Sequence, residues 1–198
     1  MSKIKVILAD FDRTLFDSST VEHLYKRGER DKEVVREKKR LGGNLPMFEG
    51  WEEVFKELEE RGIIFGIVSH NTKNFITFMT KRWGISPRVI VSRCGTILGN
   101  RRKLPKDILL RQALEKMELT DIHSSEVLYL GDQERDILWA KKFGAKAGAC
   151  FFKTEEGELL EAAPWDYKFF YPKQILSVLE KNKKVSKSGH FFKKKFEK

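Results

Sequence analysis

The feature that most constrains the fold of this chain is an alternation of short apolar runs with segments of helical periodicity. The apolar runs predict buried strands at residues 3–9, 63–68, 88–91, 127–130 and 145–152. The amphipathic segments predict helices at residues 51–61, 74–83, 105–117 and 137–143. Because strands alternate with helices, we expect an α/β domain with a parallel sheet sandwiched by helices and right-handed crossovers.

Polar side chains follow several of these apolar runs at the point where the strand ends. Asp10 and Asp12 follow the first run, Ser69 ends the second, and Asp132 comes soon after a later one. The carboxyl ends of the strands in such sheets converge on one crevice, where ligands bind. Three carboxylates in one crevice repel each other unless a cation lies among them, and hard oxygen ligands favour Mg²⁺.

The same positions carry a recognisable set of motifs. Residues 10–15 (DFDRTL) resemble the DxDxT motif that follows the first strand of the haloacid dehalogenase superfamily. Ser69 matches the Ser or Thr at the end of the second strand, and residues 131–136 (GDQERD) match the GDxxxD motif. These motifs occur in order within residues 3–152. The chain therefore resembles a phosphatase of that superfamily, which implies a Rossmann-like fold.

The resemblance, together with the residue types, implies a role for each position. Asp10 would attack phosphorus and form an aspartyl-phosphate intermediate. Asp12 would protonate the leaving oxygen and later take a proton from water. Ser69 and a lysine would bind the phosphoryl oxygens. The lysine is Lys103 or Lys106, since both lie near the start of the predicted helix. The string RKLPKDILL resembles the R-K-P-x-P-x-x-L-L stretch of the superfamily, and this resemblance favours Lys103.

The resemblance also implies a set of ligands for Mg²⁺. These would be the Asp10 carboxylate, the backbone carbonyl of Asp12 and the Asp132 carboxylate, with Asp136 in or just outside the coordination shell. A second interpretation of Asp136 remains open, because an acid in the first turn of a helix also interacts favourably with the helix dipole. No cofactor other than the metal ion is expected.

The domain organisation follows from two charged segments. Residues 1–180 are predicted to form the catalytic domain, and residues 18–43 a small helical cap insertion or an elaborated loop. The expected substrate is a small or medium anionic phosphate ester. A small cap leaves the cleft open, and an open cleft admits bulky phosphorylated substrates but does not require them. Residues 181–198 hold eight lysines and one acid, so most of the formal charge of +10 belongs to a basic tail that is expected to be mobile.

The tail leaves several partners open. Its HFFKKKF string interleaves aromatic rings with lysines, which is compatible with single-stranded nucleic acid, with an anionic membrane surface, or with phenylalanines that pack back on the core. The alternative functions are therefore a phosphatase of nucleic-acid ends or a nucleic-acid-binding protein on this scaffold. A phosphomutase is a further alternative, although a small cap would exclude water poorly.

The expected compartment is the cytoplasm. Cys94 and Cys150 stand alone and have no metal-binding spacing, so reduced thiols are the simplest interpretation. No apolar run approaches the roughly 18–20 residues that would span a bilayer. Oligomeric state is not predicted.

Overall fold

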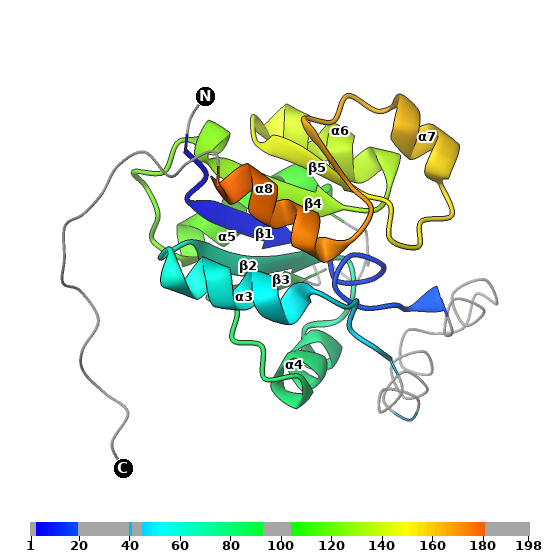
Figure 1. The fold of residues 1–198 in the computed structure, drawn as a ribbon. Helices are drawn as coiled ribbons and strands as arrows, with labels where there is room; N and C mark the ends of the chain where they lie inside the picture. The colour runs from blue at the N-terminus through cyan, green and yellow to red at the C-terminus, as the bar shows by residue number, and fades with distance from the viewer. Residues whose placement is uncertain (1–2, 20–39, 41–44, 93–103, 181–198) are drawn as a thin grey trace, which may run out of the picture.

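The apolar runs form one parallel sheet in the computed structural model of the chain, which describes residues 3–19, 40, 45–92 and 104–180. The strands lie in the order β3-β2-β1-β4-β5-β6, and every neighbouring pair is parallel. Their bounds are β1 Val6–Ala9, β2 Ile64–Ser69, β3 Val89–Ser92, β4 Val127–Gly131, β5 Lys146–Cys150 and β6 Tyr167–Phe169. The predicted parallel α/β fold is therefore confirmed (Figure 1).

Helices cover both faces of the sheet. Their bounds are α3 Trp51–Glu60, α4 Lys73–Arg82, α5 Lys106–Lys116, α6 Glu134–Phe143, α7 Gly157–Ala162 and α8 Ile175–Glu180, with short 3₁₀ turns η2 Ser124–Glu126 and η3 Pro172–Gln174. Side chains of α3, α4 and α8 pack in one core layer, and side chains of α5, α6 and α7 pack in the other. Figure 1 shows α3 and α8 together in front of the sheet.

The two core layers follow from the alternation of side chains along each strand. In β1, Ile7 and Ala9 point to the layer of α3, α4 and α8, whereas Val6 and Leu8 point to the layer of α5 and α6. All four side chains are buried, because a parallel sheet between helices has no solvent-facing side. This explains why residues 6–9 (VILA) are continuously apolar rather than alternating.

The sheet order places a change of direction next to β1. From β1 the chain builds outward through β2 and β3 on one side, and later through β4, β5 and β6 on the other. Such a point opens a crevice beyond the carboxyl ends of the two central strands. Asp10 follows β1, Ser69 ends β2 and Asp132 follows β4, so all three residues lie at that edge.

Several boundaries differ from the sequence prediction. The helix predicted at 137–143 begins at Glu134, so it contains Asp136 in its first turn. The elements α7, β6, η3 and α8 follow Cys150, where the apolar pattern predicts nothing beyond residue 152. Periodicity misses them because each spans only three to six residues.

Two predicted segments lie wholly or largely outside the described residues. These are the cap insertion at 18–43 and the basic tail at 181–198. The division into a catalytic domain and a tail therefore stays a prediction, as do the nucleic-acid and membrane partners assigned to the tail. Within the part of the chain that the structure describes, no helix is both long enough and apolar enough to cross a membrane.

Candidate active site

The loop that follows β1 carries the first two acidic residues. The Asp10 backbone N–H continues the sheet by donating to the Leu130 carbonyl at 2.8 Å, and one Asp10 carboxylate oxygen accepts from the Phe11 N–H at 2.7 Å. The loop then turns tightly, with Arg13 at a φ of 57°. The strand thus holds Asp10 rigidly, whereas Asp12 depends on a turn.

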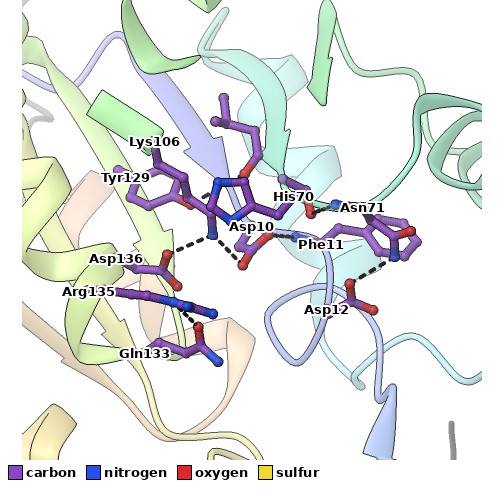
Figure 2. Close-up of polar contacts among 12 residues, drawn as sticks. Asp10, Phe11, Asp12, His70, Asn71, Lys106, Tyr129, Gln133, Arg135 and Asp136 are labelled. Carbon is purple, nitrogen blue, oxygen red and sulfur yellow. Dashed lines mark hydrogen bonds and ion pairs between the residues drawn. The ribbon is translucent and has the colours of Figure 1, made fainter. Parts of the chain in front are cut away.

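A buried lysine lies against the Asp10 carboxylate. Lys106 begins α5, and its Nζ donates to Asp10 Oδ2 at 2.5 Å and to Asp136 Oδ1 at 2.7 Å. Only 2% of Lys106 is exposed. Burial lowers the pKa of Lys106, but the neighbouring carboxylates of Asp10 and Asp136 more than offset this effect, and the pKa lies well above its ordinary value. The lysine is therefore a permanent cation between two acids (Figure 2).

A third carboxylate completes the cluster. Oxygens of Asp10, Asp132 and Asp136 all lie within 4.8 Å of one another, and all three residues are buried. Burial and the Asp136 and Asp10 carboxylates raise the pKa of Asp132 well above its ordinary value. Burial also raises the pKa of Asp136, to about 6, although the charge of Lys106 acts in the opposite direction. When all three acids are ionised, they exceed the one ammonium of the cluster by two negative charges.

One oxygen of this cluster lacks a partner. Asp136 Oδ2 is buried and has no hydrogen bond from any described residue. A buried carboxylate oxygen without a donor is costly, so its presence calls for an explanation. The unmatched negative charge and the bare oxygen together fit a site for a hard cation.

Asp136 comes this close to the end of β4 because residue 131 is a glycine. A Cβ at Gly131 would lie 2.4 Å from Asp136 Cβ, which is too close for any real pair of carbons. The glycine of the GDxxxD string therefore serves a packing need. It lets the first turn of α6 lie directly over the strand end that leads to Asp132.

Asp12 lies apart from Lys106 and contacts the segment that follows β2. Asn71 Nδ2 donates to Asp12 Oδ2 at 2.8 Å, and the Asn71 backbone N–H donates to Ser69 Oγ at 3.1 Å. Ser69 is buried at the carboxyl end of β2. Figure 2 shows Asp12 and Asn71 on one side of Asp10, with Lys106 and Asp136 on the other.

The structure thus brings together most of the residues singled out from the sequence. Asp10, Lys106, Asp132 and Asp136 form one buried cluster, and Asp12 and Ser69 are joined through Asn71. The remaining candidate, Lys103, lies outside the described residues. The structure therefore gives contacts with the cluster for Lys106 alone of the two lysines. The catalytic and metal-binding roles of these residues remain proposals.

Other neighbours of the site were not singled out from the sequence. Thr154 Oγ1 donates to the Asp132 carbonyl at 2.6 Å, and Arg13 pairs with Glu155 at 2.8 Å, so the segment after β5 fastens two parts of the site. The motifs do not include Asn71 either, although its place two residues after Ser69 is a usable signal. For Thr154 the sequence offers no signal, because the contact depends on how the segment after β5 packs against the segment after β4.

His70, beside Ser69, has a structural contact of its own. Its Nε2 lies 2.8 Å from the Leu104 carbonyl, and its ring meets the Trp139 ring edge-on at 5.5 Å between centroids. Leu104 lies two residues before Lys106, so His70 ties the end of β2 to the start of α5. This contact places the ring at the border of the site.

The fold and the site define an α/β protein with a buried cluster of three aspartates and a lysine at the carboxyl edge of its sheet. The family model of the haloacid dehalogenase-like hydrolases matches residues 19–150. The chain belongs to this family of hydrolases.

Curated relatives extend the match. A phosphoglycolate phosphatase of Synechococcus elongatus is 25% identical over 149 residues, which cover 74% of this chain and 66% of that protein. A phosphoserine phosphatase of Methanocaldococcus jannaschii is 26% identical over 183 residues, which cover 75% of this chain and 86% of that protein. Against the phosphoglycolate phosphatases the chain spans only about half to two thirds of the relative's length.

Solved structures agree with the fold. A hydrolase from Pseudomonas syringae superposes with a TM-score of 0.71 at 17% identity, with coverage of 89% of this chain and 98% of that one. At such low identity the likeness concerns the fold alone.

Proposed function

We propose that this protein is a Mg²⁺-dependent phosphatase that hydrolyses phosphomonoesters through an aspartyl-phosphate on Asp10. The observation that carries the proposal is the buried Lys106, which lies between Asp10 and Asp136 beside the carboxylate of Asp132. A permanent cation against a rigid carboxylate suits the attack of an anion on an anionic phosphate ester, because it offsets the repulsion between them.

The residues present fit a magnesium ion. The donor set consists of carboxylate oxygens, the three acids when ionised exceed the one ammonium by two negative charges, and Asp136 Oδ2 is buried without a donor among the described residues. Asp10 and Asp132 would hold the ion together with the backbone carbonyl of Asp12, and Asp136 would complete or support the shell. When bound, the ion would neutralise charge on the transferring phosphoryl group.

The first step would transfer the phosphoryl group to the protein. An Asp10 carboxylate oxygen attacks phosphorus, a new P–O bond forms, and the bond from phosphorus to the ester oxygen breaks. Asp12 gives its proton to the departing oxygen, so the product leaves as an alcohol. Lys106 and the Ser69 hydroxyl would bind the phosphoryl oxygens, where charge concentrates during transfer.

The second step would release phosphate. Asp12, now a carboxylate, takes a proton from a water molecule as that water attacks the phosphorus of the aspartyl-phosphate. The bond between phosphorus and Asp10 breaks, inorganic phosphate leaves, and both carboxyl groups return to their starting state. The two steps therefore need one nucleophile and one acid–base, which are the two acids of the DxD string.

The proposed substrates are small or medium phosphate esters. This class rests on the family and on relatives that are named for the hydrolysis of phosphoglycolate and phosphoserine. The two names share a phosphoryl group on a small carboxylic acid. The choice among esters belongs to residues that the motifs do not include.

The test is hydrolysis of p-nitrophenyl phosphate by the full chain. We expect activity that requires Mg²⁺ and that falls by at least about 10³-fold in Asp10→Asn, because the nucleophile is lost. Asp121→Asn serves as a matched control, since Asp121 is an exposed aspartate outside the cluster. Full activity in excess chelator, or in Asp10→Asn, contradicts the mechanism.

A trapping experiment addresses the intermediate itself. Borohydride reduces an acyl phosphate to an alcohol, so turnover in its presence should convert Asp10 to homoserine, which peptide mass spectrometry detects. Turnover without any modification of Asp10 argues for direct attack by water.

A further inference from the structure

The geometry points to Asn71 as a positioning residue that orients the Asp12 carboxyl group for proton transfer to the leaving oxygen. This inference rests on the proposed function, because it assigns to Asn71 a part in the acid–base step of that reaction. It goes beyond the motifs, which include Ser69 but not the residue two positions after it.

Three hydrogen bonds fix the Asn71 residue. Its Nδ2 donates to Asp12 Oδ2 at 2.8 Å, its Oδ1 accepts from the Thr72 N–H at 2.8 Å, and its backbone N–H donates to Ser69 Oγ at 3.1 Å. The amide orientation is therefore determined, since the Thr72 N–H requires the oxygen and the Asp12 carboxylate requires the nitrogen. Asn71 is half-buried in the connection between β2 and α4.

The backbone at Asp12 forms a bridge with Phe16, which places the residue but leaves the rotation of its carboxyl group to be set by side-chain contacts. Asp10 is held by strand pairing and by Lys106, whereas Asp12 lies in the turn that contains Arg13 at a φ of 57°. A carboxyl group can rotate about its last side-chain bond, and an acid must be oriented to within about 10–20° to transfer a proton efficiently. The hydrogen bond from the Asn71 amide restricts this rotation of the Asp12 carboxyl group.

The bond also selects the oxygen that carries the proton. Asp12 Oδ2 accepts from Asn71, so a proton is disfavoured there and resides on Oδ1 when Asp12 acts as an acid. In the first step, the proton passes from Oδ1 to the ester oxygen as the P–O bond breaks. In the second step, the water proton returns to the same oxygen.

A purely structural role predicts a different outcome. Thr72 precedes α4 and makes no side-chain cap of its own, so the bond from the Thr72 N–H to Asn71 Oδ1 also supports the start of that helix. Asn71→Asp keeps an acceptor for the Thr72 N–H but loses the donor to Asp12. Asn71→Ala loses both. If Asn71 only supported the helix, Asn71→Ala alone should lose activity. If Asn71 acts through Asp12, both variants should lose activity.

The experiment compares two substrates of the full chain with Mg²⁺ present: p-nitrophenyl phosphate, whose leaving group needs little protonation, and 2-phosphoglycolate, whose alkoxide leaving group needs a proton. The readout is kcat/KM, which covers all steps through departure of the leaving group. General acids contribute about 10²–10⁴-fold. We therefore expect Asn71→Asp and Asn71→Ala to lower kcat/KM by at least about tenfold for the alkyl ester and by less than about threefold for the aryl ester.

Two further measurements make the assignment specific. In an Asp12→Asn background, Asn71→Ala should cause no additional loss with the alkyl ester, because Asn71 acts only through Asp12. Asn74→Ala is the matched control, since Asn74 is an exposed asparagine in the first turn of α4. It should leave both substrates unaffected. Thermal unfolding of each variant shows whether it remains folded at the assay temperature.

Each contrary result has its own meaning. Equal losses for the two esters, or a loss that adds to that of Asp12→Asn, overturn the role of Asn71 while the proposed phosphatase stands. Unchanged kcat/KM for the alkyl ester in a folded Asn71→Asp variant overturns it as well. A wild-type chain that cleaves neither ester overturns the proposed function and this inference together.

Discussion

Lys106 is the residue of this structure whose burial most requires compensation by its neighbours. A buried ammonium is stable only where nearby charges and hydrogen bonds offset its loss of water, and here two carboxylates do so at 2.5 and 2.7 Å. Its Nζ also lies 5.7 Å from the centre of the Tyr129 ring, which adds a cation–π contact from β4. A role of Lys106 in binding an anionic phosphoryl group would account for the free-energy cost of burying this cation.

We expect Lys106→Met to fail both in stability and in activity. Removal of the ammonium leaves the Asp10 and Asp136 carboxylates buried and unpaired, a situation that costs about 3–5 kcal/mol. Loss of the phosphate-binding cation should also lower kcat/KM by at least about 10²-fold. Urea unfolding and an aryl phosphate assay measure the two effects.

Lys103→Met is the comparison that decides between the two lysines left open by the sequence. If Lys106 binds the phosphoryl group, Lys103→Met should change kcat/KM by less than about threefold. A large loss in Lys103→Met with near-normal activity in Lys106→Met would instead assign the role to Lys103, as the RKLPKDILL string favours.

At the scale of elements, the site depends on how closely α6 approaches the end of β4. Gly131→Ala would place a Cβ 2.4 Å from Asp136 Cβ, so the helix or the strand must move. We expect a loss of about 1–3 kcal/mol in stability, typical of overpacking. We also expect at least a tenfold loss of kcat/KM, because the first turn of α6 would shift by a substantial part of an ångström.

Gly157→Ala provides the control for this change. Gly157 begins α7, and a Cβ there would meet no atom within 4 Å. Stability should stay within about 1 kcal/mol of wild type and activity should be unchanged. Normal activity in Gly131→Ala would show that the close contact with Asp136 is dispensable.

A second element-scale prediction concerns α3, which supports the loop that carries the acids. Trp51 Nε1 donates to the Thr14 carbonyl at 2.9 Å, while the Trp51 ring stacks on Phe55. Trp51→Phe should cost about 1–3 kcal/mol, because a buried carbonyl loses its donor. It should also lower kcat/KM, since Asp12 lies in the same loop. Phe55→Leu, which weakens the stack but keeps the bond to Thr14, should lower stability without lowering kcat/KM.

Sequence patterns could predict the sheet because its central strands are buried on both faces and read as continuous apolar runs. They could also predict that Asp10, Ser69 and Asp132 share one edge, since that follows from parallel strands alone. Periodicity predicts the start of α6 three residues too late, because Glu134 and Asp136 are polar and carry no apolar periodicity. Asp136 is nonetheless fully buried, since it faces Lys106 rather than solvent.

What the sequence could not predict are contacts between residues far apart in the chain. The bond between Asn71 and Asp12 joins two loops, and the bond between Thr154 and the Asp132 carbonyl joins two others. Likewise the string around Lys103 and Lys106 favours one lysine, and only the geometry brings the other against Asp10. Such choices depend on tertiary packing and leave no periodic trace.

At the scale of the whole molecule, the acidic cluster should make stability depend on pH and on Mg²⁺. Burial and the neighbouring carboxylates raise the pKa of Asp132 well above its ordinary value. An acid whose pKa is higher in the folded state binds its proton more tightly there. Stability without metal therefore falls as the pH rises from the unfolded pKa of about 3.8 through the folded pKa.

Asp132→Asn isolates this contribution, because asparagine resembles the neutral acid. In chelator near pH 4 the variant and the wild type should unfold at similar urea concentrations. As the pH rises toward 7.5, the variant should become the more stable of the two, by about 1.4 kcal/mol for each unit by which folding raises the pKa. Asp121→Asn, on the exposed surface, should show no such divergence.

Magnesium should reverse that order. A ligand that binds only the folded state stabilises it by about 2.7 kcal/mol at a concentration 100 times its Kd. The wild-type chain should gain this stability at pH 7.5, whereas Asp132→Asn should lose most of the gain, because it lacks one of the proposed ligands. If Mg²⁺ raised the unfolding midpoint of both proteins equally, the cation would have to bind elsewhere. If the wild type were the more stable protein in chelator at pH 7.5, the carboxylates would not repel each other as their burial and spacing require, and the cluster would have to be balanced without a divalent ion.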